Sequence, residues 1–503
     1  MALYAQYFTI KTDKPALSYK TGDEITFFIF PRRNNGGCDL CDKVEYTIMA
    51  DDGDVVEGVV DCNPEQFATV KYVAKEPGFI SIIAKAQNEP DSFAFYDIAP
   101  GDAVADNIFE PTRAAVGVDV DKITYAGRIP DDFDEYWNSV AKTVNDFTPK
   151  LLLSDQYFNK IPDDILCLDV RISTPEGRPA SGFLCIPKKE GKYPIVMSFI
   201  GYSLAGASPR WDRNCICFCV NPHGIENGFP LSAMNTKYKS TLSGFGYDAE
   251  ENKKPETSYW HGMILRDLCA LKYAKTLDKW DGKNIVCRGG SMAAFQSVLV
   301  AAHDPDVSFL DISVPGMCDT LFVDYLRKDR PRRLTQSGWA YFDTVANAYF
   351  VKCPVNLRVN LGDQTCAPHG IMALYNALSC KKKAEFIQGG LHSQRPYEMR
   401  KFVRSFDPEN TQGIIVGGKY KHYSGKIVEV VGIADREDQE LFLTDTGPHF
   451  AINIFSADEE PLRNVIYKEE GSDKLYSLCE TKWFDSFVEN GKLITHRFAS
   501  LKE

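Results

Sequence analysis

The chain has 503 residues, of which 44% are hydrophobic and 25% are charged, and its formal net charge at pH 7 is −12. This length exceeds what one hydrophobic core supports, so we expect several domains. The acidic balance argues against nucleic acid or an anionic membrane surface as the main partner. No stretch approaches the ~20 consecutive apolar residues of a membrane span.

The cysteines and the N-terminal segment bear on the compartment. The first residues show no signal-peptide pattern, and the 15 cysteines are scattered rather than arranged as a disulfide framework. This usage suits a reducing compartment, so we expect a cytoplasmic protein, although a chain whose signal peptide had been removed would look the same. Cys38 and Cys41 form a C-x-x-C motif with no second pair at zinc-finger spacing, so a loop with thiols or a local disulfide is expected there.

Residues 1–100 predict a β-sandwich domain of immunoglobulin type. Short β-branched and aromatic runs, such as 26–30 and 79–83, are punctuated by Gly, Pro, Asn and Asp. No constellation of catalytic residue types stands out there, which favours a spacer or assembly module over a glycan-binding one. Residues 99–125 are interpreted as a linker.

Residues 101–410 predict an α/β domain, because strands alternate with helices in a way that implies a mostly parallel sheet. Pro130 is expected to open a helix that buries Phe133 and Trp137 on one face. Residues 225–256 are polar and irregular, as expected of an insertion that walls a pocket. Further strands are expected at 166–173, 182–186, 195–200, 215–220, 307–314, 355–361 and 384–387, and a further helix at 259–277.

Residues 285–302 predict a strand, a sharp turn and a helix, with Ser291 at the turn. The sequence around it, G-G-S-M-A, approaches the G-x-S-x-G pattern of a nucleophile elbow. Such a turn lifts the hydroxyl above the sheet and places it at a helix N-terminus, where backbone N–H groups can stabilise an oxyanion. A simple helix N-cap serine is the other interpretation.

A serine nucleophile needs a base and an orienting carboxylate, in the chain order Ser, Asp or Glu, His. Asp363 follows the strand expected at 355–361, and His392 follows the strand expected at 384–387. Each candidate therefore stands past the carboxyl end of its own strand, where open α/β sheets gather their catalytic groups. The oxyanion site is expected to combine the N–H of Met292 with one from the loop at Tyr202. The other histidines are expected to have surface or packing roles: His223, His261, His303, His369, His422, His449 and His496.

Residues 123–406 resemble the acetyl xylan esterase and cephalosporin-C deacetylase family, carbohydrate esterase family 7. The matching segments are Y-P-I-V-M-S-F-I-G-Y, R-G-G-S-M-A-A, N-L-G-D-Q-T-C-A-P, L-Y-N and G-G-L-H-S. The resemblance implies an α/β-hydrolase fold with the nucleophile on Ser291, the acid on Asp363, the base on His392, and oxyanion N–H groups on Tyr202 and Met292. It implies no metal and no organic cofactor. The family forms a ring-shaped hexamer, so a homo-oligomer is one expected assembly.

Residues 411–503 predict a small, mainly β domain with no obvious chemistry, with short strands expected at 427–433, 441–443, 464–467 and 496–498. The segments 417–434 and 483–488 resemble a small bacterial domain family of unknown function.

The function expected from the sequence is a serine esterase that removes acetyl groups from xylo-oligosaccharides or related glycans. Its partner is then an acetylated oligosaccharide. Two alternatives stay open: a serine peptidase of prolyl-oligopeptidase type, and a non-catalytic glycan-binding or scaffold protein on the same fold.

Overall fold

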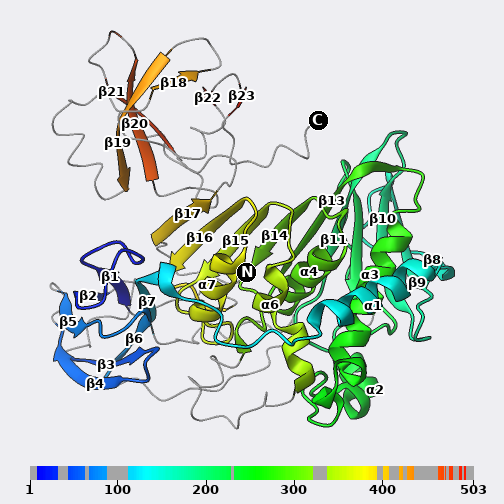
Figure 1. Ribbon diagram of the computed structural model, residues 1–503, viewed down its shortest axis with the longest axis horizontal. Coiled ribbons are helices and arrows are strands. Elements are labelled where there is room, and N and C mark those ends of the chain that lie inside the picture. Colours follow the sequence, from blue (N-terminus) through cyan, green and yellow to red (C-terminus); the bar gives the residue numbers. More distant parts are fainter. Residues whose placement is uncertain are drawn as a thin grey trace.

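The fold is described from a computed structural model (Figure 1). The residues that the structure describes, to which the statements below refer, are 8–31, 43–62, 67–87, 112–227, 231–320, 337–392, 400–406, 419–422, 427–435, 463–469, 471, 475–479, 487–489 and 492–493. The C-x-x-C motif at 38–41 lies outside them, as do His449 and His496.

The N-terminal part is a β-sandwich of two antiparallel sheets, as predicted. Its strands alternate buried and exposed side chains, most regularly in β5, where Ala68, Val70 and Tyr72 are buried between exposed neighbours. One sheet has the order β1-β2-β5 and the other β4-β3-β6-β7. The strands are β1 (Phe8–Thr12), β2 (Glu24–Pro31), β3 (Lys43–Ala50), β4 (Val55–Asp61), β5 (Ala68–Val73), β6 (Gly78–Ala86) and β7 (Thr112–Val118).

Strand β7 lies in the segment that the sequence analysis interpreted as a linker. It pairs antiparallel with β6 along seven residues, from Thr112 opposite Ala84 to Val118 opposite Gly78. The linker interpretation was therefore wrong for residues 112–118. The boundary expected at residue 100 lies outside the described residues. Alanine and glycine fill much of β7, and these residues have low strand propensity, so the segment carried little strand pattern.

The centre of the molecule is a ten-stranded sheet in the order β17-β16-β15-β14-β13-β11-β12-β10-β9-β8 (Figure 1). The six strands β11 to β16 lie together in the sheet and pair parallel with one another. The strands on either side of them, β10 and β17, pair antiparallel with β12 and β16. Strand β11 lies between β12 and β13 and pairs parallel with both, whereas β12 pairs antiparallel with β10. A mostly parallel sheet covered by helices is the α/β architecture that the sequence predicted. The strands are β8 (Leu151–Gln156), β9 (Ile165–Ile172), β10 (Ala180–Pro187), β11 (Tyr193–Ser198), β12 (Ile216–Asn221), β13 (Trp280–Gly290), β14 (Phe309–Ser313), β15 (Val355–Asn360), β16 (Lys382–Gln388) and β17 (Arg400–Phe406).

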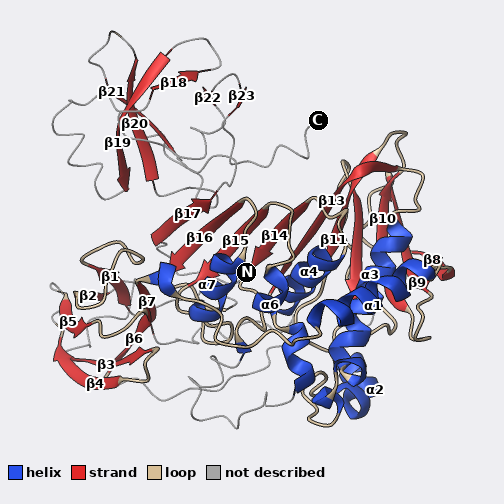
Figure 2. Ribbon diagram, in the orientation of Figure 1, coloured by secondary structure: helices blue, strands red, loops and turns tan. Residues whose placement is uncertain are grey.

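Helices pack on this sheet, whereas strands make up the described parts of the two flanking domains (Figure 2). In α4 (Met292–His303), ten consecutive residues from Met292 to Ala301 are buried, as expected for a helix enclosed on all sides. The helix predicted from Pro130 begins at Phe133 and does bury Trp137. The other helices are α1 (Phe133–Asp146), α2 (Leu231–Leu242), α3 (Tyr259–Ala274), α6 (Thr344–Ala348) and α7 (Pro368–Ala377).

Three further parts of the α/β domain differ from what the sequence predicted. Strand β8 was not predicted, because all six of its side chains are exposed and give no alternation. Strand β17 follows β16, which had been expected to end the sheet. The segment 225–256, expected to be irregular, contains α2 and two short 3₁₀ helices.

The sandwich and the α/β domain share one continuous core cluster of buried apolar side chains. Polar contacts cross the same boundary. Asp51 of the sandwich lies 2.7 Å from Nδ1 of His369 on α7, with both side chains largely buried. The amide of Gln388, at the end of β16, donates to Thr12 Oγ1 at 3.3 Å and to the carbonyl of Ala115 at 3.4 Å. The sandwich thus packs directly on the elements that follow Asp363 and precede His392.

The described C-terminal strands form a separate six-stranded sheet, in line with the mainly β domain predicted there. Its order is β21-β20-β19-β18-β22-β23. The strands predicted at 441–443 and 496–498 lie outside the described residues. The strands are β18 (Lys419–His422), β19 (Ile427–Asp435), β20 (Arg463–Glu469), β21 (Leu475–Cys479), β22 (Phe487–Glu489) and β23 (Lys492–Leu493). Across the described part of the chain, no helix has the length and apolar character needed to cross a membrane.

Candidate active site

Ser291 stands between the end of β13 and the first residue of α4, in a strained backbone conformation. Its φ of 59° and ψ of −125° are rare for a residue with a side chain. The Ser291 N–H donates to the carbonyl of Ser313 at 3.0 Å, which ties the turn to the neighbouring strand β14. Strain of this kind persists only where surrounding structure imposes it, and it is typical of a nucleophile elbow.

Gly289 makes this turn sterically feasible. A Cβ built on Gly289 would lie 2.5 Å from the Cβ of Ala293, so the first residue of the G-x-S-x-G pattern has no room for a side chain. Alanine at 293, where the pattern has its last glycine, is tolerated because Gly289 leaves that space. Strand and helix therefore nearly touch beside Ser291, as the sequence predicted.

The three residues predicted to act together do lie together. His392 Nε2 lies 3.0 Å from Ser291 Oγ, and His392 Nδ1 lies 2.8 Å from Asp363 Oδ2. The Asp363 side chain is fully buried and the His392 side chain is 26% exposed. A serine, an imidazole and a carboxylate in this order and at these distances form the relay needed for nucleophilic catalysis.

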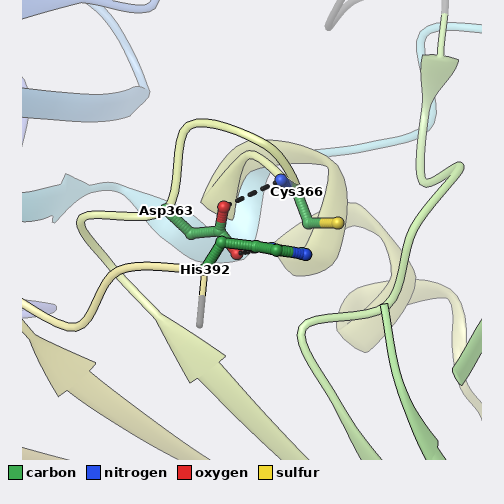
Figure 3. Close-up of side chains that lie close together, drawn as sticks. All are labelled: Asp363, Cys366 and His392. Atoms are coloured by element: carbon green, nitrogen blue, oxygen red, sulfur yellow. Dashed lines mark hydrogen bonds and ion pairs between the residues drawn. The ribbon is translucent and has the colours of Figure 1, made fainter. Parts of the chain in front are cut away.

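The carboxylate of Asp363 is fixed by its own loop. Its Oδ1 accepts hydrogen bonds from the backbone N–H groups of Thr365 at 2.8 Å and Cys366 at 2.9 Å. This leaves Oδ2 to face the imidazole (Figure 3). Pro368 then opens α7 and fixes the far end of the loop. The carboxylate therefore needs little reorganisation to hold the ring.

Asn360 holds the loop that carries His392, a role that the sequence analysis missed. Its side-chain amide donates to the carbonyl of Leu391 at 2.6 Å, and the N–H of Gly362 donates to the carbonyl of Gly390 at 2.9 Å. The ends of β15 and β16 are thereby locked to each other. The strand V-N-L-R-V-N has two other polar residues, Asn356 and Arg358, so nothing in the sequence singled out Asn360.

The two residues predicted to supply oxyanion N–H groups lie on segments joined by a buried side chain. Met292 is the first residue of α4, where backbone N–H groups have no intrahelical acceptor. Gln296, fully buried on α4, donates through Nε2 to the carbonyl of Met292 and to that of Ile200, each at 3.1 Å. Ile200 lies two residues before Tyr202, in the loop after β11. Gln296 therefore links the two sides of the candidate oxyanion site, and the sequence analysis did not identify it.

The side chain of Tyr202 forms a partly exposed aromatic surface at this loop. Its ring is stacked on Phe245 with centroids 4.3 Å apart, its hydroxyl donates to the carbonyl of Phe245 at 3.2 Å, and the residue is 45% exposed. Behind the loop, His223 Nε2 donates to the carbonyl of Ser203 at 2.8 Å and Nδ1 accepts from the Tyr259 hydroxyl at 2.6 Å. Burial lowers the pKa of His223 to about 4, so the ring is neutral at pH 7 and supports the loop.

Three further described histidines, His303, His261 and His369, contact groups other than Ser291. His303 stacks on Trp137 with centroids 3.7 Å apart, and His261 contacts the hydroxyl of Tyr136 at 2.6 Å. His369, expected in a loop, is the second residue of α7 and pairs with Asp51 as described above. Packing and interface roles thus account for these three rings.

Cys366 adds a thiol to the carboxylate and the imidazole. The potential ligand atoms of Asp363, Cys366 and His392 all lie within 4.8 Å of one another. Figure 3 shows the thiol on the same side of the Asp363 loop as the His392 ring. Among the described residues this is the one group of three or more such side chains with that spacing.

Comparisons with known proteins identify the family of this chain. The family model for acetyl xylan esterase (AXE1) matches residues 119–406. The acetyl esterase Axe7A of Xylanibacter ruminicola is 24% identical over 274 residues, covering 51% of this chain and 62% of that protein, so the chain spans less than two thirds of this relative's length.

Two solved structures were found to be similar. Acetyl xylan esterase 1 from Thermoanaerobacterium sp. JW/SL YS485 has 20% identity and a TM-score of 0.46, covering 56% of this chain and 92% of the other. The acetyl xylan esterase from Paenibacillus sp. R4 has 17% identity and a TM-score of 0.46, covering 55% and 94%. The family match covers more than half of the chain and contains Ser291, Asp363 and His392. The chain belongs to the acetyl xylan esterase family, a family of carboxylic-ester hydrolases.

Proposed function

We propose that this protein is a serine esterase that removes acetyl groups from acetylated sugars, either xylo-oligosaccharides or related glycans. The observation that carries the proposal is the hydrogen-bonded series Ser291–His392–Asp363 at a strained elbow, within a chain of the acetyl xylan esterase family.

In the proposed reaction, Ser291 Oγ attacks the acetyl carbonyl carbon while His392 Nε2 accepts its proton. Asp363 holds the imidazole through Nδ1 and stabilises the imidazolium. The N–H groups of Met292 and Tyr202 stabilise the oxyanion of the tetrahedral intermediate. Collapse breaks the ester bond, and the departing sugar oxygen takes the proton from His392. Water, deprotonated by the same imidazole, then releases acetate from Ser291.

The aromatic surface at Tyr202 supports a sugar as the alcohol part of the ester. The ring faces of pyranoses present C–H groups that pack on aromatic side chains, and Tyr202 is exposed on the loop that borders the nucleophile. A cytoplasmic location remains part of the proposal. It rests on the 15 cysteines, which are scattered along the chain rather than arranged as a disulfide framework.

The proposal is tested by replacing Ser291. Ser291→Ala should abolish hydrolysis of an aryl acetate and the reaction with a fluorophosphonate probe, while circular dichroism and the melting temperature stay close to those of the parent. Ser297→Ala is the matched control, because Ser297 is a buried serine of the neighbouring helix whose hydroxyl donates to the carbonyl of Ala293 in the helix itself. Undiminished turnover by Ser291→Ala would remove the basis of the proposal.

A substrate panel separates the esterase from the alternatives. Release of acetate from acetylated xylo-oligosaccharides, with no cleavage of aminoacyl or prolyl amides, is the expected outcome. Faster cleavage of the amides would favour a serine peptidase. No turnover and no labelling of Ser291 by the probe would favour a glycan-binding scaffold.

A further inference from the structure

The thiol of Cys366 stands beside two members of the catalytic relay, and the proposed hydrolysis does not use it. Cys366 is 8% exposed, and its backbone N–H is held by Asp363 Oδ1 at 2.9 Å, so its position relative to the carboxylate is fixed. The ligand atoms of Asp363, Cys366 and His392 lie within 4.8 Å of one another (Figure 3). A carboxylate, a thiol and an imidazole are the donor types that zinc binds in proteins.

We propose that Asp363, Cys366 and His392 form an inhibitory binding site for Zn²⁺ and similar thiophilic divalent ions. Zinc bonds to nitrogen, oxygen and sulfur are roughly 2.0–2.3 Å long, so ligand atoms around one ion lie ~3.2–3.8 Å apart. The three ligand atoms, all within 4.8 Å of one another, are therefore close to the required spacing. Asp363 keeps its two backbone hydrogen bonds through Oδ1 and offers Oδ2 to the ion.

Binding releases the thiol proton of Cys366 to solvent and forms a zinc–thiolate bond, with no change of oxidation state. Three protein ligands leave the fourth tetrahedral position to water. The His392 side chain, 26% exposed, gives the ion a route from solvent to this position.

Such an ion blocks the relay whichever ring nitrogen it binds. At Nδ1 it replaces the hydrogen bond to Asp363, and at Nε2 it occupies the lone pair that takes the proton of Ser291. The site thus makes the enzyme sensitive to free zinc. This consequence for activity rests on the proposed esterase function, whereas binding of the ion does not.

Binding is measured first without using activity. Chelator-treated protein is titrated with Co²⁺, whose thiolate complexes have a strong near-ultraviolet charge-transfer band, and Zn²⁺ is added to displace it. The Ser291→Ala chain should show the band as the parent does. Cys366→Ser should lose the part of the band that saturates with one equivalent. Cys353→Ser is the matched control, since Cys353 has the same 8% exposure but lies outside the cluster, and it should retain the band.

Inhibition is measured second, as the rate of aryl acetate hydrolysis at each Zn²⁺ concentration divided by that variant's own metal-free rate. The half-inhibiting concentration should rise at least about tenfold in Cys366→Ser and stay unchanged in Cys353→Ser. Cys366→Ala serves if the serine variant fails to fold, as judged by circular dichroism. An unchanged cobalt band and unchanged inhibition in the folded Cys366 variants would overturn the site. A cobalt band in protein that hydrolyses no ester would instead leave the site standing and overturn the proposed function.

Discussion

Replacing Gln296 by leucine tests whether the link between α4 and the loop after β11 matters for catalysis. Leucine is close to glutamine in size, and an apolar side chain suits a fully buried position. The change removes both hydrogen bonds of Nε2. The carbonyl of Met292 still accepts the helical hydrogen bond from the backbone of Gln296, so the carbonyl of Ile200 is the group that loses its partner.

The effect on stability should be small. Losing the bond to Ile200 costs about 1 kcal/mol, because Ile200 is only half-buried and water can take the place of the amide. Against this, Oε1 of Gln296 is buried without a partner among the described residues, and its removal relieves about 1 kcal/mol or more. The two contributions nearly cancel, so the free energy of unfolding should change by less than about 1 kcal/mol.

The effect on catalysis should be larger. Complete loss of an oxyanion donor lowers kcat by ~10²–10³, and a released loop weakens the donor at Tyr202 without removing it. We therefore expect kcat for an aryl acetate to fall roughly tenfold to a hundredfold, with KM changed little. Steady-state kinetics and denaturant unfolding of Gln296→Leu and of the control Ser297→Ala give both quantities. A kcat equal to that of the parent, or a loss of activity that only follows a loss of folded protein, would refute the role of Gln296.

Three further predictions concern the elbow, the supporting histidine and the domain interface. Gly289→Ala should lower both the melting temperature and kcat, since its Cβ would lie 2.5 Å from the Cβ of Ala293 and 2.7 Å and 2.8 Å from the carbonyl carbon and oxygen of the same residue. Adding Ala293→Gly should restore only part of each, because the two backbone contacts remain; a single variant that behaves like the parent would contradict the close approach. His223 should make the free energy of unfolding fall by roughly 3 kcal/mol as the pH drops from about 6.5 to about 4. The reason is that the imidazole binds a proton over this range in the unfolded protein, whereas in the folded protein its pKa is about 4 and it stays neutral. Urea unfolding of His223→Gln should show a weaker dependence on pH, and an unchanged dependence would count against a buried neutral ring. Asp51→Asn should lower the free energy of unfolding by about 1–2 kcal/mol even when unfolding is followed by tryptophan fluorescence, although every tryptophan lies outside the sandwich. A free energy equal to the parent's would mean that the contact with His369 does not couple the domains.

The parts of the site that were predicted are those fixed by chain order. Ser291, Asp363 and His392 each follow a strand that the sequence predicted, and the loops that follow parallel strands lie at the same edge of the sheet. The order of residues along the chain was therefore enough to bring these three side chains together. The central strands were predicted for the same reason, since burial on both faces leaves a continuous apolar run.

The parts that were missed depend on contacts that leave no pattern in the sequence. Gln296 and Asn360 are polar residues whose role depends on their bonding partners, and nothing in the sequence tells which carbonyls they bond to. Strand β8 has no buried face, so its pairing with β9 produces no alternation. Residues 112–118 were assigned to a linker because the partner that makes them a strand, β6, lies far from them along the chain.

The shared core has a practical consequence for anyone who wishes to trim this protein. The family match begins at residue 119, one residue after β7 ends, which invites expression of the matched segment by itself. A chain that began there would lack the sandwich that packs on α7 and β16. The side chain of Gln388 would then face water in place of Thr12 and Ala115. The limits of the shared homology are therefore not the limits of an autonomous folding unit, and a productive truncation has to retain the preceding sandwich.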